Sequence, residues 1–340
     1  MAILKTSASV SIVEEFAQKI QQEQRKAKLI RWAPVIVLVA LVVLFSITCI
    51  DSFPTTYNIV NMLNQLSITL LIATGLTFVT LIGSVDLSVD GVVGLTGSIL
   101  SVLVLNTKNG NHFGLLGVVA VILVGALCGF ISGAIHVKFR ISAFMVTFGM
   151  LSIAKGFGIM SYGGRFASIE DPLLMAIPDT SFLGIPMITW ISFIVLAIMY
   201  IVQEKTPFGR HMYAVGTNEA LPRMTGINVD NVKIKAFIWS GVCLAIAGIL
   251  GALRLGRGEI DVGIGQFFPA MAAVAIGGTA LSGGRGGVLN TLIGALIITV
   301  LNNGLLLMGV NTYIRDGVQG LIILVAVVLT VSRSGRIICK

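Results

Sequence analysis

Two carboxylates in a hydrophobic, glycine-containing run are the residues whose chemistry stands out most. Asp86 and Asp90 lie in the stretch 80–91, where most neighbouring side chains are apolar or small. In a hydrocarbon environment a carboxylate costs about 2.5–3.5 kcal/mol, so it usually faces a cavity, a partner group or a solute route. On one helical face the two would repel each other, which favours a turn in which Asp86 caps a helix near 87–93. The alternative is a pathway or ion-coupling role for these carboxylates together with Ser88.

Neutral amides form a second group of polar residues. Asn61, Asn64 and Gln65 are spaced i, i+3, i+4, so they share one face of a helix. Amides can hydrogen-bond the hydroxyl groups of a solute without holding it by charge. They can equally bond to neighbouring helices, at about 0.6 kcal/mol each, and both interpretations remain open. Asn302 and Asn303 are adjacent, so we expect at most one of them to line a pathway.

A charged cluster follows one of the hydrophobic segments. Its members are Arg254, Arg257, Glu259 and Asp261. A rim of mixed charge suits the docking of a soluble protein, because complementary charges steer association. The alternative is that the long side chains extend to the membrane interface and pair locally.

Several kinds of chemistry find no support in the residue pattern. The four cysteines have no CxxC spacing, and the three histidines are scattered without a second ligand at helical spacing. The sequence also contains no GxxxxGK[ST] phosphate-binding loop. We therefore expect no metal site, no cofactor on this chain and no catalytic activity of its own.

The elements that must position these residues are membrane-spanning helices. Of 340 residues, 56% are hydrophobic and 11% are charged, against about 25% charged in soluble domains. Apolar stretches near the length of a bilayer crossing recur along the chain. The sequence predicts an all-α transmembrane bundle of about ten spans, some short or broken: 33–50, 59–82, 92–106, 114–137, 141–160, 187–202, 236–255, 267–281, 288–310 and 317–332.

The charge distribution tests this count. With ten spans both termini lie on one side, and the segments on that side carry 17 lysines and arginines, against five on the other. Cytoplasmic loops carry the excess of positive charge, so both termini are expected in the cytoplasm. The chain then divides into an amphipathic N-terminal segment (1–32), a transmembrane domain (33–332) and a cytoplasmic tail (333–340).

The longest polar stretch, 203–235, lies on the cytoplasmic side. In it, Asn218 is placed to cap a short helix and Gly226 to end it. A short helix held away from the bilayer would be a docking surface for another protein; an ordinary solvated loop is the alternative.

Four stretches, in order, resemble permease subunits of ATP-binding cassette (ABC) importers, in particular the ribose- and xylose-type members of the branched-chain amino acid and sugar permease superfamily. The first runs from Asn58 through Asn61, Asn64 and Gln65 to the turn Asp86-Leu-Ser-Val. The second is Asn218-Glu-Ala followed by Gly226-Ile. The third is Ala272-Ala-Val-Ala-Ile-Gly-Gly-Thr-Ala-Leu-Ser-Gly-Gly, and the fourth joins Leu292-Ile-Gly-Ala to Asn302-Asn-Gly-Leu.

The resemblance implies a multi-pass protein of the bacterial inner membrane that moves a monosaccharide or similar small polar solute inward. It implies three kinds of partner: ATPase subunits that bind ATP and Mg²⁺, an external substrate-binding protein, and a second permease copy, identical or different. The residues implied to contact the ATPase are Asn218, Glu219, Ala220, Gly226 and Ile227.

The chain also departs from the family pattern. Leu221 replaces an alanine in the cytoplasmic stretch, and Ser84 and Asp90 stand where the family usually has glycine. An alternative function is an ion-coupled secondary transporter that uses Asp86 and Asp90.

Overall fold

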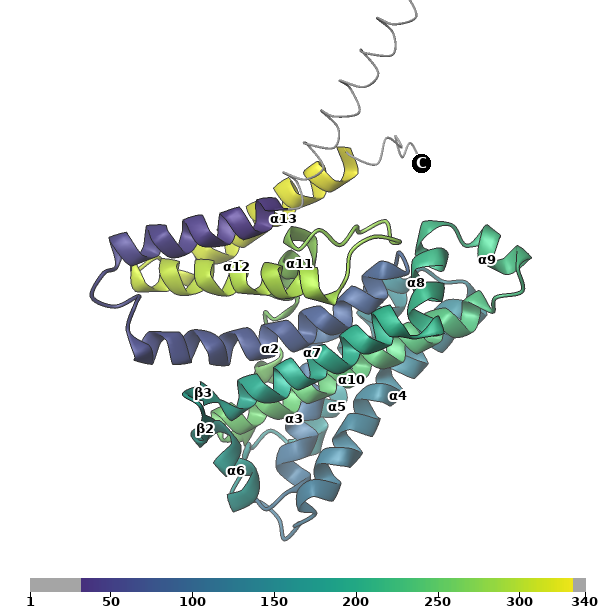
Figure 1. Ribbon diagram of the computed structural model, residues 1–340. Coiled ribbons are helices and arrows are strands. Elements are labelled where there is room, and N and C mark those ends of the chain that lie inside the picture. Colours follow the sequence, from purple (N-terminus) through teal and green to yellow (C-terminus); the bar gives the residue numbers. More distant parts are fainter. Residues whose placement is uncertain (1–31, 333–340) are drawn as a thin grey trace, which may run out of the picture.

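Each hydrophobic segment expected from the sequence coincides with a helix in residues 32–332, the part of the chain that the computed structural model describes (Figure 1). Six helices are long and apolar enough to cross a membrane: α2 (Thr56–Leu81), α4 (Gly114–Phe139), α5 (Ala143–Tyr162), α7 (Met187–Lys205), α10 (Val229–Leu255) and α12 (Val288–Leu307). The other segments are the helix Trp32–Thr48, α3 (Val89–Leu103), α11 (Phe267–Ile276) and α13 (Thr312–Ser332).

The fold is therefore a helical membrane bundle, while the count of ten spans and the position of the termini remain predictions. The expected amphipathic helix in 1–31 and the tail 333–340 lie outside the described residues. Strand structure in the described part is confined to four two-residue strands, which pair as β1 (Ala167–Ser168) with β4 (Arg257–Gly258) and β2 (Ser181–Phe182) with β3 (Ile185–Pro186).

Short helices connect the long ones at both ends of the bundle, and their starts are readable from the sequence. α6 (Pro172–Asp179) begins after Asp171, whose carboxylate accepts the first free backbone N–H groups. α8 (Pro207–Thr217) begins after Thr206, whose hydroxyl accepts the N–H of Gly209. A proline at the first helical position follows each cap. α9 (Ala220–Met224) and the 3₁₀ turn η1 (Ile260–Val262) complete the set.

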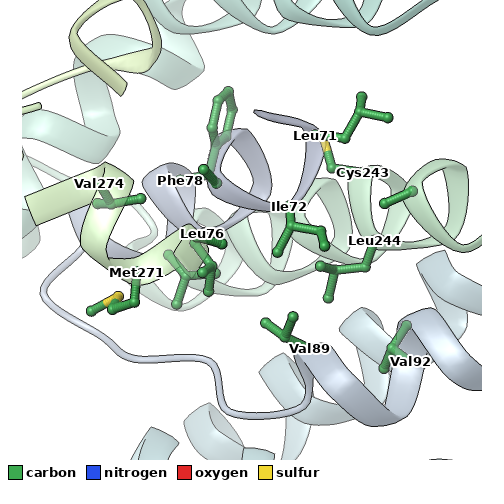
Figure 2. Packing of buried hydrophobic residues seen from close by; sticks show 14 of the residues in the cluster. Leu71, Ile72, Leu76, Phe78, Val89, Val92, Cys243, Leu244, Met271 and Val274 are labelled. Carbon is green, nitrogen blue, oxygen red and sulfur yellow. The ribbon is translucent and has the colours of Figure 1, made fainter. Parts of the chain in front are cut away.

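Helix α2 runs through the centre of the bundle. Apart from Thr69, every residue from Leu66 to Leu81 is buried. Figure 2 shows its side chains packed against Val89 and Val92 of α3, Cys243 and Leu244 of α10, and Met271 and Val274 of α11. Because α2 contacts helices on several sides, it forms the centre around which the surrounding elements pack.

Small residues allow α4 and α10 to pack at backbone contact. Gly125, Gly129 and Gly133 form one stripe of α4, and a Cβ atom on Gly129 would lie 2.2 Å from the carbonyl oxygen of Phe237. Between membrane helices, where no hydrophobic driving force operates, such stripes permit close van der Waals packing. The other faces of α4 are largely exposed, as expected for a helix at the edge of the bundle.

Helices α3 and α11 are too short to cross a bilayer, with 15 and 10 residues. Between α2 and α3 the chain runs without helical structure through Ile82–Ser88 and turns back into the bundle. Asp86, in this segment, contacts Ser240 of α10, which lies 11 residues past the start of that helix. Eleven residues correspond to about 16 Å along a helix, so Asp86 lies deep between the helices. The turn expected before a helix near 87–93 is therefore present, and the structure adds that this turn is buried.

Candidate functional site

The Asp86 carboxylate is buried and accepts hydrogen bonds at both of its oxygens. Its Oδ1 accepts the backbone N–H of Ser88 at 2.9 Å and the Ser88 hydroxyl at 2.6 Å, and its Oδ2 accepts the Ser240 hydroxyl at 3.1 Å. No Lys, Arg or His nitrogen of the described residues lies within 4.0 Å. Since Ser88 directly precedes α3, the carboxylate lies at the positive end of that helix.

Asp90 hydrogen-bonds to the start of a different helix, α11. Its carboxylate accepts the backbone N–H of Gly265 at 3.1 Å and of Phe267 at 2.9 Å, so it lies at the start of α11. The two carboxylates therefore do not form a pair: each meets the N–H groups at the start of a separate short helix. The sequence missed this cross-element contact, because nothing local links Asp90 to a residue 175 positions later.

A cavity of about 660 Å³ opens at the end of the bundle that contains the start of α2 and the end of α12. Of the amides predicted from the sequence, Asn61, Gln65 and Asn303 line it, and Arg254 faces it from α10. The remaining lining residues are Asp51, Ser52, Thr55, Tyr57, Asn58, Leu306 and Leu307.

Asn58 is a cavity residue that the sequence analysis did not single out. Its side-chain amide and that of Asn303 exchange two hydrogen bonds, at 2.9 and 2.8 Å, joining α2 to α12. Asn58, Asn61 and Gln65 are spaced i, i+3, i+7 and therefore share one helical face. This spacing could have identified Asn58 as a cavity residue from the sequence.

Two of the predicted amides lie elsewhere. Asn302 does not line the cavity; its Oδ1 accepts a hydrogen bond from Gln319 of α13 at 2.6 Å. Asn64 Oδ1 is buried and has no hydrogen-bond partner among the described residues. Asp86 and Ser88 also lie away from this cavity.

The charged cluster after α10 divides in two. Arg257 and Glu259 form an ion pair at 2.9 Å, and the Arg257 guanidinium lies 5.0 Å from the ring centroid of Phe166. Glu259 is buried, whereas Asp261 is exposed. Arg254 lines the cavity, while docking of a soluble protein on these four residues remains a prediction.

At the opposite end of the bundle, α9 projects beyond the neighbouring helices (Figure 1). The Asn218 side chain accepts the N–H of Ala220 at 2.9 Å, and Gly226 ends the turn with φ of +81°. Ion pairs fasten the segment to α10: Glu219 to Lys233 at 2.5 Å and Arg223 to Asp230 at 2.7 Å.

Two large apolar side chains are exposed on α9, beside the half-exposed Arg223. Leu221 is 62% exposed and Met224 is 84% exposed. An exposed pair of large apolar side chains on a short, fastened helix is typical of a protein contact surface.

The base of this projection is α8, where Tyr213 is half-buried. Burial and the neighbouring Glu204 carboxylate raise the pKa of the Tyr213 hydroxyl well above its usual value. A phenol is protonated at physiological pH even at its usual pKa of about 10, and the shift only widens that range, so Tyr213 is available as a hydrogen-bond donor.

Comparison with known proteins identifies the family. Residues 58–327 match the family described as "Branched-chain amino acid transport system / permease component". The chain is 39% identical to the ribose import permease protein of Haemophilus influenzae over 296 residues, covering 85% of this chain and 90% of that protein. It is 34% identical to the ribose import permease protein of Bacillus subtilis over 326 residues, covering 93% and 99%.

A third relative is the D-allose transport system permease protein of Escherichia coli, with 33% identity over 299 residues, covering 86% of this chain and 89% of that protein. No solved structure matches the chain. These relatives are named as permeases rather than as ATPases, and together with the six long apolar helices they make this chain a multi-pass protein of the inner membrane. The chain is a member of the branched-chain amino acid transport system permease family, as an ABC-type sugar permease.

Proposed function

We propose that this chain is the membrane-spanning subunit of an ATP-driven importer that moves a monosaccharide or a similar small polar solute inward. The observation that carries the proposal is the form of α9: a short helix, fastened by two ion pairs and presenting exposed Leu221 and Met224 away from the bundle. A secondary transporter has no need of such a projection. The separate hydrogen bonding of Asp86 and Asp90 also removes the basis for a coupled carboxylate pair.

The solute enters through the cavity lined by Asn61, Gln65 and Asn303. Amide side chains offer both donors and acceptors, which match the hydroxyl groups of a sugar. A volume of about 660 Å³ falls within the range of about 300–1,000 Å³ typical of small-molecule sites. The relatives named for ribose and D-allose support a monosaccharide as the solute class.

Energy comes from partner subunits. ATPase subunits, which bind ATP and Mg²⁺, dock on α9 through the segment Asn218–Ile227 and push it when they close. A second permease copy, identical or different, completes the pathway. An external binding protein delivers the solute to the cavity, using the charged residues that follow α10, Arg257, Glu259 and Asp261.

The test is reconstitution of the chain with its ATPase and binding protein in sealed vesicles, followed by uptake of labelled ribose, allose and arabinose. Uptake that requires ATP supports the proposal. Uptake driven by a proton gradient without ATP would instead support the secondary-transporter alternative.

A substitution on α9 tests whether this helix is the docking surface for the ATPase. Met224→Asp places a charge on a side chain that is 84% exposed, so the fold should tolerate it while ATPase capture is lost. The matched control is Leu183→Asp, at a position 79% exposed in the β2–β3 turn at the other end of α7. Equal ATPase capture by both variants would contradict docking at α9.

A further inference from the structure

Helix α8, the base of the α9 projection, makes backbone contact with two distant parts of the chain. A Cβ atom on Gly216 would lie 1.9 Å from the carbonyl oxygen of Leu81 and 2.5 Å from the nitrogen of Gly284. The N–H of Gly284 in turn donates to the Leu81 carbonyl at 2.8 Å. The end of α8, the end of α2 and the loop before α12 therefore meet without intervening side chains. Because this contact is closely packed, a displacement of α8 must also displace the end of α2 or the loop before α12.

A buried glutamine joins the same region to the start of α12. Gln203 of α7 is 2% exposed, and its Oε1 accepts the backbone N–H of Val288, the first residue of α12, at 2.9 Å. Its Nε2 donates to the Tyr213 hydroxyl of α8 and to the Glu204 carboxylate, both at 2.7 Å. The Gln203 amide thus uses both of its donor hydrogens and its acceptor to connect α7, α8 and α12.

The Tyr213 hydroxyl has one proton and two acceptors within reach. It lies 2.8 Å from the carbonyl oxygen of Gly286 and 3.0 Å from Glu204 Oε1. The peptide unit that carries the Gly286 carbonyl is anchored, because its N–H, that of Gly287, donates to the Thr279 hydroxyl at 3.2 Å and Gly286 packs closely against Thr279. Since a hydroxyl donates one strong hydrogen bond at a time, rotation of the O–H exchanges one acceptor for the other without leaving a donor unpaired.

Helix α12 then links this region to the cavity. Val288 lies at its first position and Asn303 lies 15 residues further along, at the cavity wall. Fifteen residues correspond to about 22 Å of continuous helix. A single rigid element therefore joins the hydrogen bonds next to α8 with the amide pair of Asn58 and Asn303.

We propose that Tyr213 and Gln203 are positioning residues that transmit the movement of α9 to α12 and so couple ATPase closure to the state of the cavity. This inference rests on the proposed function. When α8 is pushed, the Tyr213 hydroxyl exchanges Gly286 for Glu204, which releases the loop before α12. Gln203 keeps the first turn of α12 attached to α7 during the change.

The test uses the full complex of permease, ATPase and binding protein in vesicles and measures solute transported per ATP hydrolysed. Tyr213→Phe removes the hydroxyl and keeps the ring, and Gln203→Met keeps the side-chain length without the amide. Each should lower the ratio about fivefold, equivalent to about 1 kcal/mol at 1.36 kcal/mol per tenfold. ATPase capture should be unchanged, because α9 itself is intact.

Tyr313→Phe, at a position 83% exposed on α13, is the matched control and should keep the wild-type ratio. Thermal unfolding of each purified variant separates loss of fold from loss of coupling, and if one variant does not fold, the other decides. Wild-type ratios in the folded variants would overturn the inference and leave the importer proposal intact. Absence of ATP-dependent uptake in the wild-type complex would overturn both.

Discussion

Replacing Asp86 with asparagine should leave the protein nearly as stable as the wild type. The asparagine Oδ1 can still accept the N–H and the hydroxyl of Ser88, and its Nδ2 can donate to the Ser240 hydroxyl, which then accepts. The hydrogen bonds become weaker, but burying the amide costs less than burying a charge. These opposing effects should leave the free energy of unfolding within about 1 kcal/mol of the wild-type value.

Replacing Asp86 with alanine should destabilise the protein clearly. The Ser88 N–H and the Ser240 hydroxyl lose their acceptor, and a buried unsatisfied donor costs about 1–3 kcal/mol. The Ser240 hydroxyl can turn to a carbonyl of its own helix, which reduces its share. We expect a total loss of about 2–4 kcal/mol.

Both variants should be measured by detergent unfolding and by uptake in vesicles, with Asp179→Asn, an exposed carboxylate at the end of α6, as the control. The structural role of Asp86 predicts that the asparagine variant retains ATP-driven uptake. A stable asparagine variant without uptake would refute the reasoning, because only the loss of a charge or of a titrating group would then explain the defect.

Three further predictions concern packing and the cavity, and stability is measured by unfolding in detergent. Gly129→Ala should lower the free energy of unfolding by about 1–3 kcal/mol, because its Cβ would meet the Phe237 carbonyl. Gly149→Ala has open space around it and should raise the free energy of unfolding by about 0.5–1 kcal/mol. Asn303→Leu should cost about 1–3 kcal/mol in the same series, because the Asn58 Oδ1 loses its donor and the Asn58 Nδ2 keeps only the Phe53 carbonyl. A double-mutant cycle with Asn58→Ala that gives no interaction energy between the two positions would contradict the pairing. Asn61→Ala should reduce ATP-driven uptake of the transported solute without changing the unfolding midpoint. Loss of both uptake and stability would show that this amide supports the fold instead.

Much of the fold follows from local properties of the sequence. The hydrophobic segments coincide with helices because backbone groups in a membrane must be satisfied within the segment, so a long apolar run can only be helical there. The short helix after Asn218 and its end at Gly226 were also predictable, because a capping side chain and a glycine with positive φ act within a few residues.

Contacts between distant segments were not predictable in this way. The segment 82–88 was expected to form a turn, but its local sequence does not indicate that the turn returns into the bundle, where Ser240 supplies a donor to Asp86. The sequence suggests that Asp90 acts together with Asp86, whereas in the structure its carboxylate accepts hydrogen bonds at the start of α11. Neither contact leaves a signal in local spacing.

The sequence alone determined that this is a helical membrane protein with a short helix inside its longest polar stretch, and its motifs pointed to the permease family. Periodicity, capping and hydropathy act over a few residues, and therefore they can be read along the chain. Only the tertiary structure decided which amides share the cavity, where each carboxylate finds its donors, and how Tyr213 comes to lie beside Gly286. These relations depend on the packing of helices that are far apart in sequence, and packing is fixed by the whole bundle at once.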